Sequence, residues 1–110
     1  MKTITRDELK GMIDRGDDVA VVETLDEKYF RKFHLPGAIN VPPGDGFDER
    51  IRQAVPDKDK PVVVYCMDEA CDASPKAARS MEELGYTNVM DYAAGKMDWK
   101  NADLPIENSH

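Results

Sequence analysis

Short apolar runs along the chain alternate with segments of helical periodicity. Residues 19–23 and 62–65 are apolar without polar alternation, which is typical of strands buried on both faces of a parallel sheet. Residues 38–41 and 88–92 predict two further strands, each bounded by turn-forming residues. Strands that alternate with helices predict an α/β fold, in which helices cover both faces of a central parallel sheet.

Helical segments separate these predicted strands. Thr5 and Glu8 have the spacing of a capping box, and the apolar helical face that follows ends at Gly16. Shorter helices are predicted over residues 26–32, 47–55 and 95–101.

The segment from residue 61 to residue 76 joins a predicted strand to a helix and contains both cysteines of the chain. Cys66 follows the strand directly. Ser74 before Pro75 has the features of a helix N-cap, although Asp72 could cap the helix instead. The carboxyl end of a strand in such a sheet is where ligands bind, and the positive end of the next helix favours a thiolate.

Length and charge limit the classes of protein that the chain can represent. At 110 residues and 41% hydrophobic content, we expect one domain over residues 1–110. A net charge of -7 argues against nucleic acid or an anionic membrane as a partner, because both would be repelled. The opening residues lack the apolar core of a signal peptide, so we expect a cytoplasmic protein.

The two cysteines, Cys66 and Cys71, are too close in sequence to staple distant parts of a fold. Redox or nucleophilic use is the more economical interpretation. For Cys66 the alternative is a small buried apolar residue at a strand end.

Four segments spread over most of the chain form a specific pattern when taken together. They are His34-Leu-Pro-Gly-Ala-Ile-Asn-Val-Pro, Val62-Val-Val-Tyr-Cys66, Ala77-Ala78 through Leu84-Gly85-Tyr86 to Asn88-Val89, and Ala94-Gly95 with Trp99 and Leu104-Pro105-Ile106-Glu107. Together they resemble the rhodanese-like domain family of single-domain sulfurtransferases. The resemblance implies a parallel sheet of about five strands and a persulfide of sulfane sulfur carried on Cys66. It also implies that His34 is structural, packing the turn before Pro36 and Gly37.

The sequence departs from this family's pattern at two places. Where members carry an Asp-Val-Arg-like triplet, this chain has Glu23-Thr24-Leu25, without the arginine. Members commonly have about five residues in the active loop. The loop here is longer by about two, lacks Arg and Gly, and comprises Met67, Asp68, Glu69, Ala70, Cys71, Asp72 and Ala73.

The acidic residues of this loop change the expected sulfur donor. A sulfur carrier needs a thiolate nucleophile, and inward-facing loop amides would stabilise its charge. Asp68, Glu69 and Asp72 would repel the thiosulfate dianion, so we expect a neutral polysulfide or a persulfide as donor and a thiol, including a protein thiol, as acceptor. The alternative is that these acids face solvent away from Cys66.

Cys71 is a candidate resolving thiol, because it lies within disulfide reach of Cys66 if the loop folds back. Its attack on a Cys66 persulfide would release sulfide and leave a disulfide between the two cysteines. The alternative for Cys71 is a loop cysteine packed beneath the start of the helix.

Rival classes of function remain open at this point. The lost arginine and the unusual loop favour a non-catalytic rhodanese-like interaction or redox-sensor module as the alternative to a sulfurtransferase. Cysteine phosphatases and arsenate reductases use an arginine where this chain has Asp72, which would repel an oxyanion. A zinc site made of Cys66, Cys71, His34 and a carboxylate would lack the paired spacing of zinc modules, so we expect no metal. We also expect no cofactor, and we expect the protein to be a monomer.

Overall fold

The computed structural model describes residues 1–108. Five parallel strands form one sheet in the order β1-β5-β4-β2-β3. The strands are β1 (Lys2–Thr3), β2 (Ala20–Glu23), β3 (Ile39–Asn40), β4 (Val62–Tyr65) and β5 (Val89–Tyr92). The helices are α1 (Arg6–Arg15), α2 (Glu27–Lys32), α3 (Phe47–Ala54), α4 (Ala73–Glu83) and α5 (Gly95–Asn101).

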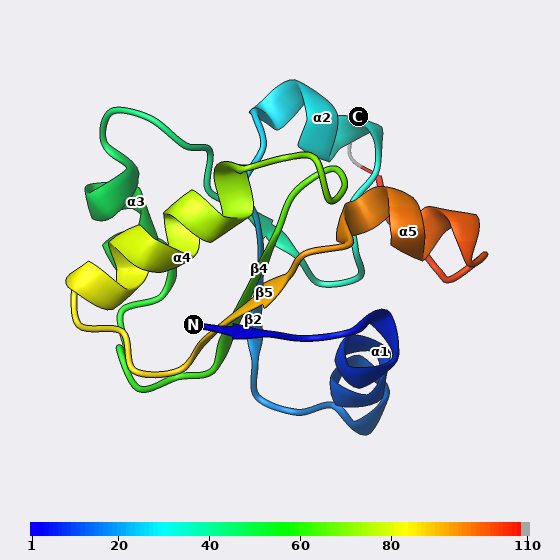
Figure 1. The fold of residues 1–110 in the computed structure, drawn as a ribbon, viewed down its shortest axis with the longest axis horizontal. Helices are drawn as coiled ribbons and strands as arrows, with labels where there is room; N and C mark the ends of the chain where they lie inside the picture. Colours follow the sequence, from blue (N-terminus) through cyan, green and yellow to red (C-terminus); the bar gives the residue numbers. More distant parts are fainter. Residues whose placement is uncertain (109–110) are drawn as a thin grey trace.

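Helices cover both faces of the sheet, which confirms the fold class expected from the sequence (Figure 1). One apolar cluster joins β2, β4 and β5 to α3 and α4, and includes Val64, Ile51 and Met81. The cluster on the opposite face joins the same strands to α1 and α5, and includes Leu9 and Trp99. The apolar runs of β2 and β4 therefore serve two layers of core at once.

The first helix begins and ends as its sequence predicts. The Glu8 amide donates to the Thr5 hydroxyl at 3.1 Å, and the Thr5 amide donates to the Glu8 carboxylate at 3.1 Å, which completes the capping box. Gly16 ends the helix with a φ of 71°, in the left-handed region that favours glycine.

Two strands differ from the expectation. β1 was not predicted, because Lys2 and Thr3 are polar and exposed and become a strand only by pairing with Met90 and Asp91 of β5. The strand expected over residues 38–41 shortens to Ile39–Asn40.

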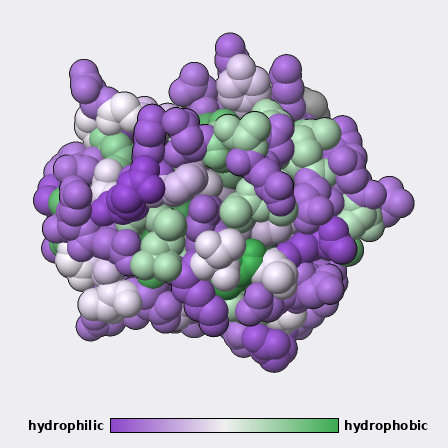
Figure 2. Space-filling model, viewed as in Figure 1, coloured by the Kyte–Doolittle hydropathy of each residue, from purple (hydrophilic) through white to green (hydrophobic). Residues whose placement is uncertain are grey.

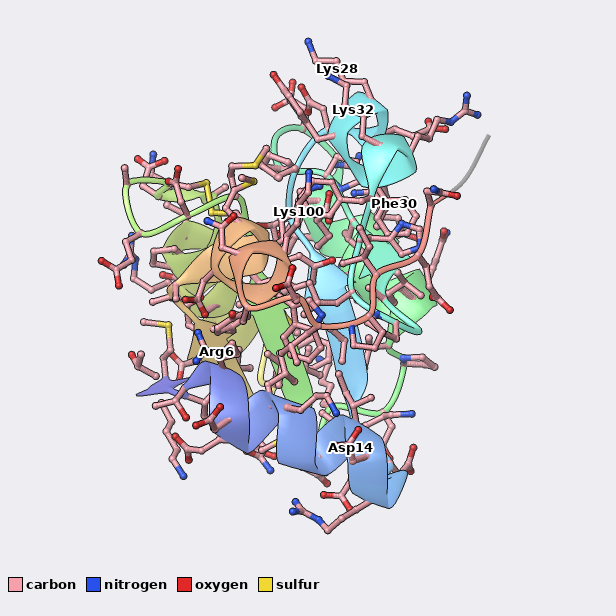
Figure 3. The ribbon with its side chains drawn as sticks, turned by 90° about the vertical axis from the view of Figure 1, so that its right-hand side faces the viewer. Arg6, Asp14, Lys28, Phe30, Lys32 and Lys100 are labelled. Atoms are coloured by element: carbon pink, nitrogen blue, oxygen red, sulfur yellow. A yellow bond between two sulfur atoms is a disulfide. The ribbon has the colours of Figure 1, made fainter. Side chains whose placement is uncertain are left out.

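Charged groups dominate the surface. The face in Figure 2 is mainly hydrophilic, with apolar residues in small separate patches. Figure 3 shows Lys28 and Lys32 of α2 at one end of the molecule and Asp14 of α1 at the opposite end. Among the described residues, no helix has the length and apolar character needed to cross a membrane. The cytoplasmic location stays a prediction.

Candidate active site

The carboxyl end of β4 places Cys66 at the centre of the candidate site. Val62 to Tyr65 are fully buried, and Cys66, the next residue, is 1% exposed. Two amides at the start of α5 hold this turn of chain, since Lys96 N–H donates to the Cys66 carbonyl at 2.9 Å and Met97 N–H donates to the Met67 carbonyl at 3.0 Å. Cys66 therefore lies on a well-anchored backbone.

Gly95 allows the close approach between α5 and this segment. Its φ is 79°, and a β-carbon built on it would lie 2.5 Å from the Met67 carbonyl oxygen. A larger residue would push the start of α5 away from the cysteine-bearing turn.

Cys66 and Cys71 are joined by a disulfide, with their α-carbons 6.4 Å apart. The loop thus folds back, as the sequence allowed, and brings the two sulfur atoms together. Cys71 is more exposed than Cys66 and immediately precedes the N-cap of α4. The candidate nucleophile Cys66 and the candidate resolving thiol Cys71 therefore lie in one site.

Asp68 closes the loop into a turn, which uses two of the loop amides that the sequence suggested for stabilising the Cys66 thiolate. The Cys71 amide donates to the Asp68 carbonyl at 3.1 Å, and the Ala70 amide donates to the Asp68 carboxylate at 3.1 Å. These two amides are thus committed to Asp68 and are not turned toward the thiol as an anion nest. Hydrogen bonds to Asp68 therefore stabilise the turn of the longer loop.

The start of α4 follows the second of the two alternatives from the sequence. Asp72, and not Ser74, is the N-cap, although its side chain makes no capping hydrogen bond, and Ala73 is the first helical residue instead of the last loop residue. Ser74 is buried at 2% exposure and its hydroxyl hydrogen-bonds to the Asp91 carboxyl. Because the Ser74 side chain turns into the core, it cannot fold back over the helix amides.

The three loop acids face solvent. Asp68, Glu69 and Asp72 are exposed. Lys76 hydrogen-bonds to Asp72 with the charged atoms 3.0 Å apart and holds the pKa of that carboxyl below its ordinary value. Glu69 also borders an open cavity of about 340 Å³ between the start of α1 and α5. Arg6 and Asp98 form an ion pair in that cavity at 3.0 Å, and Cys66 does not line it.

A buried charged cluster adjoins Cys66 through Tyr65, the residue before it in the chain. It comprises Glu23, Tyr65 and Lys96, and we call it the Glu23 cluster. Tyr65 O–H donates to Glu23 at 2.9 Å, and the Lys96 ammonium donates to Glu23 at 3.1 Å. The ammonium also donates to the carbonyls of Tyr29 and Phe33 at 2.8 Å, so all its protons are used.

Burial dominates the ionisation of the Glu23 cluster. It raises the pKa of Glu23 and lowers that of Lys96, while the opposite charge counteracts each shift. The sequence drew attention to Glu23 only because the arginine of the family's triplet is missing near it, and Lys96 was not predicted. Glu23 at the end of an apolar strand did indicate that a positively charged partner exists, because a buried carboxylate needs one.

His34 is structural, as the resemblance implied. Its ring stacks on Phe30 with centroids 3.8 Å apart, and its Nδ1 lies 2.8 Å from the Phe30 carbonyl oxygen. Its backbone pairs with Glu107. The ring thus fixes the chain before Pro36 and takes no part in the cysteine site.

Comparisons with known proteins identify the family. The family model of the rhodanese-like domain matches residues 5–102, and the chain belongs to that family. The BH2092 protein of Bacillus halodurans has a similar crystal structure, with a TM-score of 0.88 and 26% identity over 98% of this chain and 77% of that one.

Two curated relatives point to different uses of this domain. The thiosulfate sulfurtransferase PspE of Escherichia coli is 42% identical over 69 residues, which cover 63% of this chain and 62% of PspE. The HTH-type transcriptional regulator Rv0324 of Mycobacterium tuberculosis is 32% identical over 104 residues, which cover 94% of this chain and 44% of the regulator. The matched residues thus span less than two thirds of the length of either relative.

Proposed function

We propose that this protein is a small sulfurtransferase that carries sulfane sulfur as a persulfide on Cys66, with Cys71 as resolving thiol. The observation that carries the proposal is the position of Cys66 at the carboxyl end of β4 with its sulfur bonded to Cys71. Membership of the rhodanese-like family and similarity to a sulfurtransferase support the reaction class.

The cycle begins when a dithiol reductant opens the disulfide: its first thiol forms a mixed disulfide with one cysteine, and its second thiol releases that cysteine and becomes a disulfide with the first. The freed Cys66 thiol loses its proton, attacks the terminal sulfur of a persulfide as a thiolate, forms a Cys66 persulfide and releases the donor as a thiol. An acceptor thiol then removes the outer sulfur. Alternatively, Cys71 attacks the Cys66 sulfur, the outer sulfur leaves as hydrosulfide, and the disulfide closes again.

A neutral polysulfide or a persulfide is the proposed donor. The exposed acids Asp68, Glu69 and Asp72 oppose a dianion, and Asp68 occupies two loop amides that an anion would need. Thiosulfate is therefore proposed to be a poor donor, in contrast to what the name of PspE states for that protein.

Mass spectrometry and turnover with substituted cysteines test the proposal. Reduced protein exposed to polysulfide should gain the mass of one sulfur atom on Cys66, and Cys66→Ser should lose both this adduct and sulfur transfer. Cys71→Ser should retain the adduct and prolong its lifetime, because the internal resolving thiol is gone. Wild-type turnover by Cys66→Ser would overturn the proposal.

A redox-sensor module is the second candidate. The loop disulfide favours it, and so does the similarity to a region of a transcriptional regulator. A sensor would open and close the disulfide without turning over a sulfur donor. Catalytic release of sulfide or of persulfidated acceptor therefore separates the two functions.

A further inference from the structure

Asp91 of β5 is a buried carboxyl that the sulfur-transfer cycle above does not use. It is 3% exposed, and within residues 1–108 its Oδ1 atom has no hydrogen-bond partner. Burial raises its pKa, although the hydrogen bond from Ser74 acts in the opposite direction. A buried carboxyl with an oxygen left unpartnered carries a desolvation cost, which is characteristic of functional groups.

The register of the sheet places Asp91 on the same face as Cys66. Val89 packs in the cluster of α3 and α4, whereas Met90 and Tyr92 pack on the opposite face, so Asp91 points toward α4. Asp91 pairs with Val64, and Cys66 lies two residues beyond Val64 on that same side. Strand spacing puts the α-carbons of Asp91 and Cys66 roughly 8 Å apart, which is close enough for a proton to pass between the side chains directly or through one water.

The two sulfurs of the disulfide differ in their access to solvent. Cys66 is 1% exposed, whereas Cys71 is half-buried. An external thiolate therefore attacks the Cys71 sulfur, and Cys66 is the leaving group. A thiolate left at Cys66 would be a buried charge that solvent water does not reach to protonate, and burying an unpaired charge costs free energy.

We propose that Asp91 is the proton donor to Cys66 when a thiol opens the Cys66–Cys71 disulfide, and the proton acceptor when the disulfide closes. On opening, a bond forms between the reductant sulfur and Cys71 Sγ, the disulfide bond breaks, and Cys66 Sγ takes the proton of the Asp91 carboxyl. The second thiol of a dithiol reductant then releases Cys71 as a thiol and becomes a disulfide itself. Asp91 recovers its proton from solvent.

Other ionisable groups around this position are poorly placed for the role. On α4, Asp72 and Lys76 are exposed and paired with each other. Tyr86, buried beyond the far end of α4, donates its hydroxyl to the Val55 carbonyl. On β1, the residue paired with Asp91 is Thr3, which does not ionise near neutral pH.

The test is the rate at which a dithiol reduces the disulfide of wild-type protein and of Asp91→Asn, measured across pH without any sulfur donor. Below the pKa of Asp91 the wild type should react faster by about 10²-fold, the lower end of what a positioned proton donor contributes. The ratio of the two rates should fall as pH rises through the pKa of Asp91, because the carboxyl then has no proton to give. A ratio that is independent of pH, or equal to one throughout, would overturn the proposal.

Glu83→Gln, which neutralises an exposed acid on α4, is the matched control and should reproduce the wild-type profile. If Asp91→Asn does not fold, NMR titration of the Asp91 carboxyl in wild-type protein replaces it. Its titration should change when the disulfide is opened, because the two groups then share protons. An identical titration in both states would contradict the proposal.

The inference rests on the proposed function only in that opening the disulfide frees Cys66. A protein that shows the expected reduction profile but forms no persulfide would retain Asp91 as proton donor and lose the sulfurtransferase assignment. The opposite result would retain the sulfurtransferase and exclude Asp91.

Discussion

Lys96 shows how a single buried charge joins elements that are distant in sequence. Its side chain is 1% exposed and reaches from α5 to Glu23 of β2 and to the carbonyls of Tyr29 and Phe33 around α2. The ammonium lies at the carboxyl end of α2, where the dipole of that helix favours a positive charge. Lys96 therefore holds α2 and α5 together behind the cysteine site.

Replacing Lys96 with methionine should destabilise the fold strongly. Lys96→Met leaves Glu23 buried without its counter-ion, and breaking a buried ion pair in this way costs about 3–5 kcal/mol. Urea denaturation measures the free energy of unfolding. Lys100→Met, at an exposed position of α5, is the matched control and should change it by less than about 0.5 kcal/mol.

The double variant Glu23→Gln, Lys96→Met should be more stable than Lys96→Met, because no ion then remains buried. If the double variant lost the sum of the two single costs instead, Glu23 and Lys96 would not be coupled.

At the scale of elements, the loop between β4 and α4 carries the charges on which the proposed choice of sulfur donor depends. Its turn is built by Asp68, and its other acids, Glu69 and Asp72, face solvent. Since none of these side chains is buried, their combined field depends on ionic strength.

Neutralising the loop acids should therefore change donor preference. The triple variant Asp68→Asn, Glu69→Gln, Asp72→Asn should raise thiosulfate turnover by about tenfold at low salt and the turnover of a neutral organic polysulfide much less. Steady-state rates with both donors at two salt concentrations measure the effect. Asp14→Asn, at the far end of α1 in Figure 3, is the control for net charge, and an equal gain with both donors would exclude electrostatic selection.

At the scale of the whole molecule, the disulfide joins the end of a central strand to the start of a covering helix within one chain. The anchored backbone at Cys66 and the turn at Asp68 already hold the two cysteines on one side of the sheet. A net charge of -7 also opposes the close approach of two copies. These features favour an intramolecular bond.

Oxidation should accordingly remove both free thiols and leave the protein monomeric. Thiol titration and size-exclusion chromatography of reduced and oxidised protein measure the two quantities. Cys71→Ser retains one thiol and should form dimers only slowly, because Cys66 is buried. A disulfide found between chains in wild-type protein would contradict this arrangement.

The expectation of one domain over residues 1–110 stays a prediction.

Much of the fold was predictable because local sequence determines local structure. The capping box at Thr5 and the glycine at Gly16 specify the ends of α1 through contacts within a few residues. The apolar run from Val62 to Tyr65 specifies a strand buried on both faces, and Cys66 follows it wherever the strand lies.

The sequence by itself thus determined the α/β architecture, the position of Cys66 at a strand end and the nearness of Cys71. Only the tertiary structure decided β1, which depends on pairing with β5, and the pairing of Glu23 with Lys96, which are 73 residues apart. It also decided that Ser74 hydrogen-bonds to Asp91 beneath α4 and that Asp72, the other cap candidate, is the N-cap. Strand order and register bring these residues together, and no local pattern encodes either of them.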